Sequence, residues 1–259
     1  MKQAADATLP RFAGIGFSGV GLEGALESVD RRPADAPFAY VVTPNVDHVV
    51  RLNRTGFTYA SMYEEALLCL CDSAVLAALM RLLRVKIPKA PGSDLVGLLL
   101  ANAVRPGDIL TVVGCSVGVV DALRKRHPEA VIHHHEPPMN FILDPEATAC
   151  AVAFVEAHPA RFVFLCLGSP QQELLAYCLK RRGHAKGTGL CCGIAIHYAT
   201  GSIRRAPVAA RRLGLEWLFR MMSEPGRLWR RYMIEGPYVF LLFLKELHLT
   251  STRSRASSK

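Results

Sequence analysis

The sequence predicts an α/β fold with a Rossmann-like, mostly parallel sheet and helices on both faces, followed by a helical, arginine-rich C-terminal part. Short apolar runs alternate with helical patterns from Tyr40 to Ile194, which is typical of repeated strand–helix–strand units. This alternation stops at Pro207. The chain has 259 residues, of which 51% are hydrophobic, so it is long and apolar enough to bury a sizeable core.

Six apolar runs have the length and composition of buried strands: residues 40–42, 67–71, 108–113, 130–134, 162–167 and 189–194. Six stretches have apolar positions at helical spacing: residues 46–53, 74–84, 94–103, 118–126, 145–158 and 170–182. Because helices fall between the strands, the strands are expected to run parallel. Ligands in such folds bind beyond the carboxyl ends of the strands, in the loops that open the next helix.

The C-terminal part is expected to form a helical appendage. Helices are predicted over residues 207–222 and 227–249, with Pro225 and Gly226 between them. Gly236 and Pro237 are expected to kink or break the second helix. The chain therefore divides into an α/β domain over residues 1–203, the appendage over residues 204–249 and a disordered, Ser-rich and basic tail over residues 250–259.

Most of the excess positive charge lies in the appendage. The formal net charge is +9, and between residues 204 and 231 eight arginines stand against two glutamates. Arginine suits phosphate oxygens because its planar guanidinium donates parallel hydrogen bonds. These arginines are interleaved with Trp217, Phe219, Trp229 and Tyr232. The pattern favours phosphates, an anionic membrane surface or nucleic acid, and the alternative is a solvated basic helix face.

The rest of the composition narrows the class of protein. No segment approaches the roughly 18 apolar residues that a membrane-spanning helix needs. Residues 1–17 lack the apolar centre of a secretory signal. The 8 cysteines form no C-x-x-C pair, and we expect reduced, buried thiols. A cytoplasmic protein is expected.

Two strand-ending loops carry side chains suited to chemistry. Thr43-Pro44-Asn45 follows the first strand, where a hydroxyl and an amide can fix a sugar or nucleotide hydroxyl. Asn45 can equally serve as a helix cap. Asp72 follows the second strand, where its carboxylate is either a general base or an N-cap. Local sequence leaves both alternatives open.

Two further loops join a strand to a helix through glycine. Gly114 and Gly168 permit close approach of a ligand, and Pro170 suits the first helical turn. Free backbone N–H groups at such a helix start attract phosphate. Neither loop matches a P-loop.

Three other patterns give weak or negative signals. Gly14-Ile15-Gly16-Phe17-Ser18-Gly19 has the spacing of a dinucleotide-binding loop, but the strand before it is poor and no acidic residue follows in the expected context. The run His133-His134-His135 ends a predicted strand, so its side chains alternate between faces and cannot all bind one metal. The chain has no D-x-D, so no metal site is expected, and arginines would have to offset the charge of a diphosphate.

Taken together, these residues resemble the WecG/TagA/CpsF-type glycosyltransferase family, which includes wall teichoic acid N-acetylmannosaminyltransferase, N-acetylmannosaminuronic acid transferase and xanthan-type exopolysaccharide glycosyltransferases. The resemblance covers nearly the whole chain. It rests on Thr43-Pro44-Asn45, Asp72, Gly92-Ser93-Asp94, Leu167-Gly168-Ser169-Pro170-Gln171-Gln172-Glu173, Arg205-Ala206-Pro207, Gly214-Leu215-Glu216-Trp217-Leu218-Phe219-Arg220, Glu224-Pro225, Arg227 and Arg230-Arg231-Tyr232.

The resemblance implies an inverting, metal-independent enzyme that uses a UDP-sugar and a polyprenyl-diphosphate-linked acceptor in exopolysaccharide or cell-surface polysaccharide synthesis. It implies no cofactor, a peripheral location at the inner face of the cell membrane, and Asp72 as the catalytic base. The expected substrate-binding residues are Thr43, Asn45, Gly92, Asp94, Gly114, Gly168, Pro170, Gln172 and Glu173. The expected diphosphate- or membrane-binding residues are Arg205, Arg211, Arg220, Arg227, Arg230 and Arg231.

Two departures from the family pattern bear on the donor sugar. Ser73 stands where the family usually has glycine, and residues 192–198 replace a run richer in glycine and phenylalanine. Two alternatives come from other classes of protein. A basic nucleic-acid-binding protein rests only on the mixture of arginines and aromatics, and a nicotinamide-dependent oxidoreductase rests only on the Gly14–Gly19 pattern. A homo-oligomer is compatible with the sequence.

Overall fold

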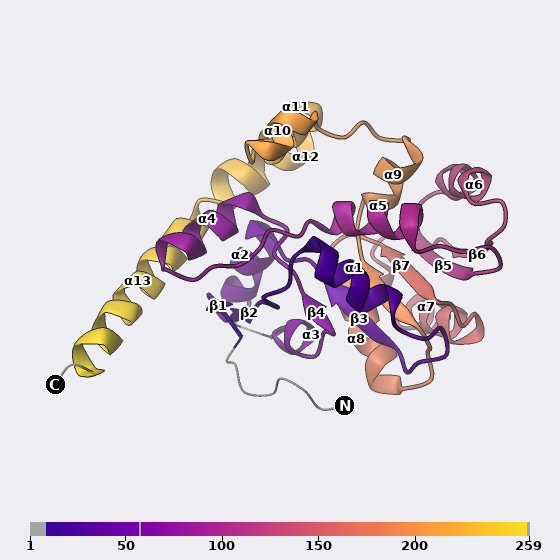
Figure 1. Cartoon of the computed structure of the whole chain (residues 1–259), viewed down its shortest axis with the longest axis horizontal. Helices are drawn as coiled ribbons and strands as arrows, with labels where there is room; N and C mark the ends of the chain where they lie inside the picture. The colour runs from indigo at the N-terminus through magenta and orange to yellow at the C-terminus, as the bar shows by residue number, and fades with distance from the viewer. Residues whose placement is uncertain (1–8, 57, 258–259) are drawn as a thin grey trace.

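The computed structural model describes residues 9–56 and 58–257 of the chain (Figure 1). Residues 1–8, which open the stretch where no secretory signal is expected, lie outside the described residues, as do residues 258–259 of the predicted tail. Within the described ranges, no helix combines the length and apolar character needed to cross a membrane.

Six parallel strands form the central sheet in the order β4-β3-β8-β7-β5-β6. They are β3 (Ala39–Val42), β4 (Leu68–Cys69), β5 (Ile109–Gly114), β6 (Val131–His135), β7 (Phe162–Cys166) and β8 (Thr188–Cys191). Each lies where the sequence predicts a strand, which confirms the α/β class. The order places the ends of β3, β4 and β8 side by side, although β8 comes last in the chain.

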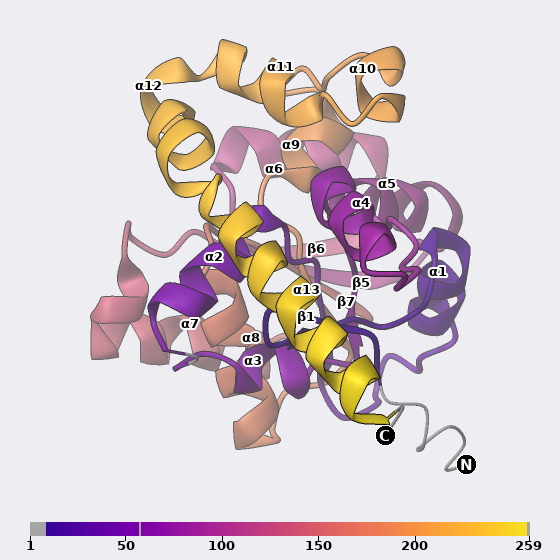
Figure 2. The same ribbon diagram turned by 90° about the vertical axis from the view of Figure 1, so that its left-hand side faces the viewer.

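Helices cover both faces of the sheet (Figures 1 and 2). One face packs against α1 (Leu22–Asp30), α5 (Gly92–Asn102), α6 (Val117–Arg126) and α9 (Ala195–Thr200). The other packs against α2 (Val46–Arg54), α3 (Ser61–Glu64), α4 (Ala74–Leu82), α7 (Pro145–Ala157), α8 (Gln171–Arg182) and the short η1 (Phe141–Leu143). The six helices predicted within the α/β part are confirmed, whereas α1, α3 and α9 were not predicted.

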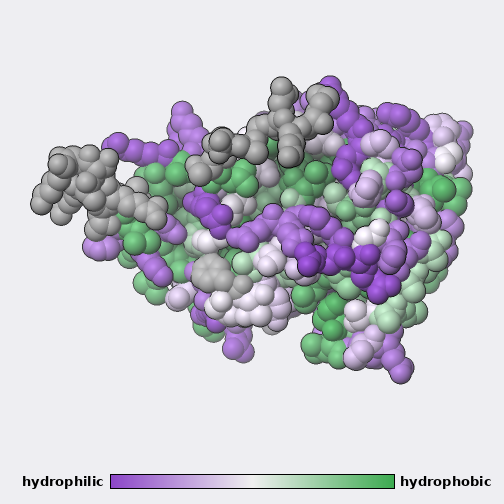
Figure 3. All heavy atoms as spheres, turned by 90° about the horizontal axis from the view of Figure 1, so that it is seen from below, coloured by the Kyte–Doolittle hydropathy of each residue, from purple (hydrophilic) through white to green (hydrophobic). Residues whose placement is uncertain are grey.

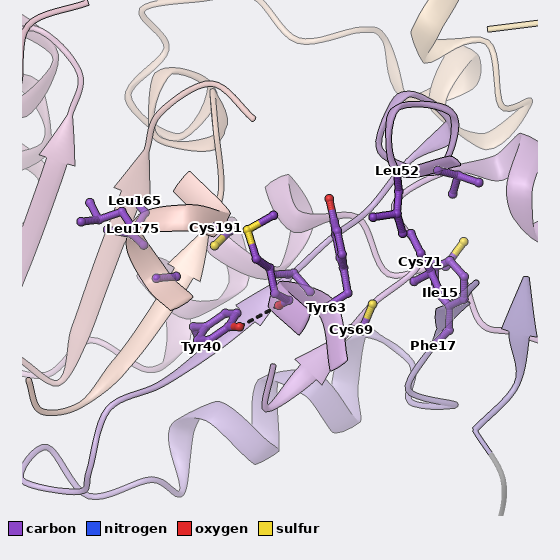
Figure 4. Close-up of a cluster of buried hydrophobic side chains, with 14 of the residues drawn as sticks. Ile15, Phe17, Tyr40, Leu52, Tyr63, Cys69, Cys71, Leu165, Leu175 and Cys191 are labelled. Carbon is purple, nitrogen blue, oxygen red and sulfur yellow. Dashed lines mark hydrogen bonds between the residues drawn. The ribbon is translucent and has the colours of Figure 1, made fainter. Parts of the chain in front are cut away.

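Each face of the sheet has its own hydrophobic cluster, because successive side chains of a strand point to opposite faces. Phe162 and Phe164 of β7 enter the cluster beside α1, α5 and α6, whereas Val163 and Leu165 enter the other. In that second cluster the Tyr40 hydroxyl donates to the Met62 carbonyl over 2.7 Å (Figure 4). The one polar atom of this buried ring is thus satisfied.

An antiparallel hairpin precedes the α/β units. It consists of β1 (Arg11–Phe12) and β2 (Ile15–Gly16), and Ala13 and Gly14 form its turn with φ of 46° and 88°. The glycine pattern that begins at Gly14 therefore lies in a hairpin. A dinucleotide loop needs a turn from a parallel strand into a helix, so the fold removes the geometric basis of that alternative.

The appendage consists of five helical segments: α10 (Val208–Arg212), α11 (Glu216–Ser223), α12 (Pro225–Trp229), the π-helix η2 (Arg230–Glu235) and α13 (Tyr238–Ser257). The single helix predicted over residues 207–222 is two helices, because Gly214 has a φ of 74° and ends the first. Gly236 and Pro237 separate η2 from α13, as expected. The helix α13 continues to Ser257, whereas the sequence predicts disorder from residue 250.

The helix α13 crosses the α/β body beside α2 (Figure 2). Val239 and Leu242 are 1% and 5% exposed and belong to the same hydrophobic cluster as Val49 of α2. The Arg54 guanidinium also lies over the Tyr238 ring, 5.3 Å from its centroid. Buried apolar contacts therefore hold the appendage on the α/β body.

If α13 is part of the core, Leu242→Ala should lower the free energy of unfolding by about 2–5 kcal/mol, because it leaves a cavity. The matched control is Leu241→Ala, since Leu241 on the same helix is 60% exposed. That change should stay within about 0.5 kcal/mol of the wild type. Denaturant titration of the full chain measures both, and equal effects would show that α13 does not pack as described.

Candidate active site

A cavity of about 390 Å³ lies between the carboxyl ends of β3, β4 and β8 and the appendage. This is the size of a small-molecule binding site. The α/β body contributes Thr43, Asn45, Asp72, Ser73, Gly92, Ser93, Cys192, Ile194 and Tyr198 to its lining. The appendage contributes Gly214, Glu216, Trp217, Arg220, Arg231, Tyr232 and Phe240. Two parts of the chain that are far apart in sequence thus enclose one pocket.

Asp72 follows β4 and presents its carboxylate to this pocket. The N-cap of α4 is the next residue, Ser73, whose hydroxyl accepts from the backbone N–H of Leu76 over 3.3 Å. Asp72 is therefore not the N-cap of α4, the helix that follows it. Its Oδ1 accepts instead from the backbone N–H of Gly92, 3.3 Å away, at the start of α5.

The surroundings of Asp72 adjust its basicity. Burial, together with the nearby Glu216 carboxylate, raises the pKa of Asp72 to about 6. His48, Arg220 and the Gly92 N–H act in the opposite direction, because each favours the ionised form. A carboxylate with this pKa is mostly ionised at neutral pH and is a stronger base than an exposed aspartate, as general base catalysis requires.

Thr43 and Gly92 shape the wall of the pocket next to Asp72. A Cβ atom on Gly92 would lie 2.6 Å from the Thr43 hydroxyl oxygen, so only glycine lets α5 begin this close to the end of β3. The close approach also brings the Gly92 N–H to Asp72. Asn45 combines both roles considered for it, since its side chain caps α2 by accepting from Asp47 N over 3.0 Å and also lines the pocket.

Asp94 does not line the pocket. Its Oδ1 accepts from Arg205 over 2.6 Å and from Arg211 over 3.2 Å, and Arg205 also contacts Glu216 over 3.3 Å. These four side chains are all partly buried. The structure therefore places three residues predicted to bind substrate or diphosphate in a polar cluster that joins the appendage to α5.

Arg220 and Arg231 are the predicted cations that line the pocket. Arg231 lies 3.3 Å from the Asp47 carboxylate, and its guanidinium donates to Asn45 Oδ1 over 3.4 Å. The Nε of each of these arginines is buried without a hydrogen-bond partner. Arg220 differs from Arg231 because its side chain forms no ion pair or hydrogen bond within the described part of the chain. Arg220 is therefore a cation beside Asp72 that is available to an anionic ligand.

Arg227 and Arg230 lie on the surface of the appendage. Arg227 pairs with Glu224 over 2.6 Å and Arg230 with Glu235 over 3.2 Å, and their side chains are 57% and 79% exposed. Neither lines the pocket. The six predicted arginines thus form three groups. Arg205 and Arg211 anchor the appendage, Arg220 and Arg231 line the pocket, and Arg227 and Arg230 face the solvent.

The predicted residues at the ends of β5 and β7 lie outside the pocket lining. Gly114 has a φ of 91°, and a Cβ there would lie 2.5 Å from the Cys166 carbonyl, so contact between the two strands explains this glycine. Gly168 and Pro170 form the turn into α8, and Pro170 is its N-cap residue. Gln172 and Glu173 are buried behind the pocket, where Gln172 Oε1 accepts from the Gly193 N–H over 2.9 Å.

Sequence reasoning missed several residues of the pocket wall. Trp217 and Tyr232 meet edge to face with ring centroids 5.9 Å apart, and Glu216 raises the pKa of Asp72. From sequence, these aromatics indicate a membrane or nucleic-acid surface. Their positions within the family motifs could have indicated a place in the active site. Only the folded appendage, however, puts them in the same pocket as Asp72.

The three histidines of residues 133–135 contact different neighbours. His134 contacts the Gly114 carbonyl over 3.1 Å, whereas the His133 and His135 rings pack on His158 and Phe154. The predicted alternation between faces is thus confirmed. In the part of the chain that the structure describes, no three His, Cys, Asp or Glu side chains are grouped as metal ligands.

The parallel α/β sheet presents a carboxylate to a pocket that also contains an unpaired arginine, an arrangement suited to an anionic substrate held beside a base. The model of the Glycosyl transferase WecG/TagA/CpsF family matches residues 10–253, nearly the whole chain. The protein belongs to this family and is a glycosyltransferase. The family supports a nucleotide-sugar donor and a glycan acceptor.

Asp72→Asn should lower the rate of sugar transfer by on the order of 10²-fold or more, because the amide cannot take a proton. The variant should be at least as stable as the wild type above pH 6, since it removes an ionised carboxylate that burial disfavours. Asp144→Asn is the matched control, because Asp144 caps α7 away from the pocket and asparagine also caps helices. An Asp72→Asn enzyme as fast as this control would contradict the assignment.

Proposed function

We propose that the protein is an inverting, metal-independent glycosyltransferase that moves a sugar from a UDP-sugar to a polyprenyl-diphosphate-linked glycan in bacterial exopolysaccharide or cell-surface polysaccharide synthesis. The observation that carries this proposal is the presence of a base and an unpaired cation in one pocket, Asp72 and Arg220. Family membership supports the glycosyl transfer itself.

Inversion requires that the acceptor hydroxyl attacks the anomeric carbon from the side opposite the leaving group. Asp72 takes the proton of that hydroxyl while the new carbon–oxygen bond forms. The bond between the anomeric carbon and the phosphate oxygen breaks, and UDP leaves with its electron pair. One carboxylate base is enough for this single displacement.

The negative charge that grows on the departing diphosphate needs a cation. Arg220 lies close enough to Asp72 to lower the pKa of that carboxyl, so it reaches the region where the leaving group is expected. Arg231 lines the same pocket but shares its charge with Asp47. We assign the stabilisation of the leaving group mainly to Arg220, because fixed donors aimed at developing charge lower the barrier to reaction. Metal independence is part of this proposal, with arginine supplying the charge.

The lipid-linked acceptor places the enzyme at the cytoplasmic face of the membrane. Large apolar side chains of the appendage are exposed: Trp229, Ile234, Phe240, Leu241 and Leu244. Arginines such as Arg230 lie among them. Apolar patches also interrupt the hydrophilic surface seen from below (Figure 3). Apolar and basic side chains together are typical of helices that lie in the headgroup region.

The direct test is protein-dependent UDP release from a panel of UDP-sugars, with a polyprenyl-diphosphate glycan as acceptor and EDTA present. Wild-type enzyme should release UDP with one donor despite EDTA. Arg220→Gln should lower the rate by on the order of 10²-fold, as loss of one transition-state donor does. The control Arg227→Gln removes an arginine that pairs on the surface and should keep the rate. Activity that EDTA abolishes and Mg²⁺ restores would contradict metal independence.

Anionic lipid vesicles should sediment with the full chain at low salt and release it as salt rises, because the attraction of basic residues fades over a Debye length. Leu241→Glu with Leu244→Glu should abolish binding. Val131→Glu is the control, since Val131 is 50% exposed on β6, outside the appendage. If the double variant binds as tightly as the control, α13 is not the membrane contact. Preference for DNA over vesicles would favour the nucleic-acid alternative.

A further inference from the structure

Three cysteines lie at the carboxyl ends of neighbouring strands. Cys115 follows β5, Cys166 ends β7 and Cys192 follows β8, and these strands are adjacent in the sheet in the order β8-β7-β5. The backbone N–H of Cys192 donates to the Leu165 carbonyl over 3.2 Å, so the pairing of β8 with β7 continues one residue beyond β8. Cys192 also lines the pocket. A thiol at the edge of the sheet is therefore part of the active-site wall.

The side chains of Cys166 and Cys192 lie on the same face of the sheet. Both pack against the hydrophobic cluster beside α1, α5 and α6, whereas Cys191 belongs to the cluster on the opposite face. The two sulfur atoms are 3.5 Å apart. Neighbouring strands are about 4.8 Å apart, and a disulfide spans roughly 4.4–6.8 Å between Cα atoms. Rotation of the two side chains is therefore enough to bring the sulfurs to bonding distance.

The neighbouring thiols are placed less well for such a bond. Cys115 contacts Cys166 as well, but it is buried, does not line the pocket, and its sulfur lies 3.8 Å from His197 Nδ1. The Cys191 thiol donates to the Gln172 carbonyl over 3.6 Å on the other side of the sheet. The pair at the ends of β7 and β8 thus combines a short sulfur–sulfur contact with a place in the pocket wall.

Cys192 is the thiol of this pair that a small oxidant in the pocket meets first, because Cys166 does not line the pocket. Burial, together with the neighbouring thiols of Cys115 and Cys192, raises the pKa of Cys166 well above its usual value. Cys166 is therefore protonated at neutral pH, and a protonated thiol is a poor nucleophile. It can still react second, because the sulfur it attacks is already beside it.

We propose that Cys192 and Cys166 form a redox-sensitive pair in the wall of the active site, in which hydrogen peroxide converts the two thiols to a disulfide and slows sugar transfer. The Cys192 sulfur attacks a peroxide oxygen, the O–O bond breaks, and one water leaves behind a sulfenic acid. The Cys166 sulfur then attacks the Cys192 sulfur, the S–O bond breaks, and a second water leaves. Two thiols thus give two electrons and two protons to one peroxide.

The disulfide acts on transfer through the loop that follows β8. This loop continues from Cys192 to Ile194 and Tyr198, which also line the pocket. A bond to Cys166 draws the Cys192 sulfur towards β7 and fixes the start of the loop there. The transfer rate should fall by about 10-fold or more, because small displacements of a pocket wall misplace the reacting groups. This effect rests on the proposed function, since the assay uses its donor and acceptor, whereas formation of the disulfide does not.

Peptide mapping of the full chain tests the disulfide without any substrate. Reduced protein is treated with hydrogen peroxide, free thiols are alkylated, and the protein is cut with trypsin. Peptides 162–180 and 187–204 should be joined through Cys166 and Cys192 by a bond that dithiothreitol breaks. Cys166→Ser should lack this link, and its Cys192 should gain oxygen instead. The control Cys150→Ser removes an exposed thiol of α7 and should keep the link.

A wild-type protein without the link, or with Cys166 joined to Cys115, would overturn the proposal. So would a Cys166→Ser protein whose Cys192 takes up no oxygen, because Cys192 would then not be the first thiol to react. Thermal unfolding checks that each variant is folded.

The transfer assay tests the effect on activity with the same samples. Peroxide should slow wild-type protein and Cys150→Ser alike, and dithiothreitol should restore both. Cys166→Ser should transfer at the normal rate when reduced, but peroxide should inactivate it beyond rescue, because further oxidation of Cys192 to a sulfinic acid is irreversible. Linked protein that transfers as fast as reduced protein would overturn the proposal. Reduced protein that transfers no sugar would instead contradict the proposed donor and acceptor.

Discussion

The ion pair between Asp94 and Arg205 is the contact on which the pocket depends. It joins the first turn of α5 to the start of the appendage over 2.6 Å, and Arg211 strengthens it from the next helix. The same turn of α5 contains Gly92, whose N–H contacts Asp72. The first turn of α5 therefore contacts Asp72 through Gly92 and holds the appendage, which forms the opposite wall of the pocket, through Asp94. The buried side chains of α13 fix the far end of that wall.

The position of the appendage over Asp72 affects the pKa of this residue. Asp72 lies at the end of a two-residue strand, where solvent would reach it if the appendage were absent. Burial and Glu216 raise the pKa of Asp72, and Arg220 partly offsets this effect. The appendage thus supplies both the carboxylate that raises the pKa of the proposed base and the cation proposed to stabilise the leaving group. Basicity and charge stabilisation are set by the same segment that carries the exposed apolar side chains proposed to meet the membrane.

The sequence predicts the sheet well because buried parallel strands such as β5 and β7 are continuous apolar runs with helices between them. It does not predict the hairpin β1–β2, whose strands are too short for a periodic signal. The place of Asp72 in the pocket could be predicted from its position after a strand and from the family resemblance. Which arginines line the pocket and which anchor the appendage could not be predicted. Arg205 and Arg220 differ in the residues that surround them in the folded chain, and the sequence does not show this. The contact between His48 and Glu173 could not be predicted either, because it joins side chains of two different helices.

The pH dependence of kcat/KM tests the central claim most directly, namely that Asp72 is a base whose strength the closed pocket sets. The rate should be level at neutral pH and fall as pH drops below about 6, where Asp72 takes up a proton. Glu216→Gln removes a neighbouring negative charge and should move the midpoint of this fall to lower pH. A rate that is insensitive to pH around 6, or a midpoint that Glu216→Gln leaves in place, would contradict the account.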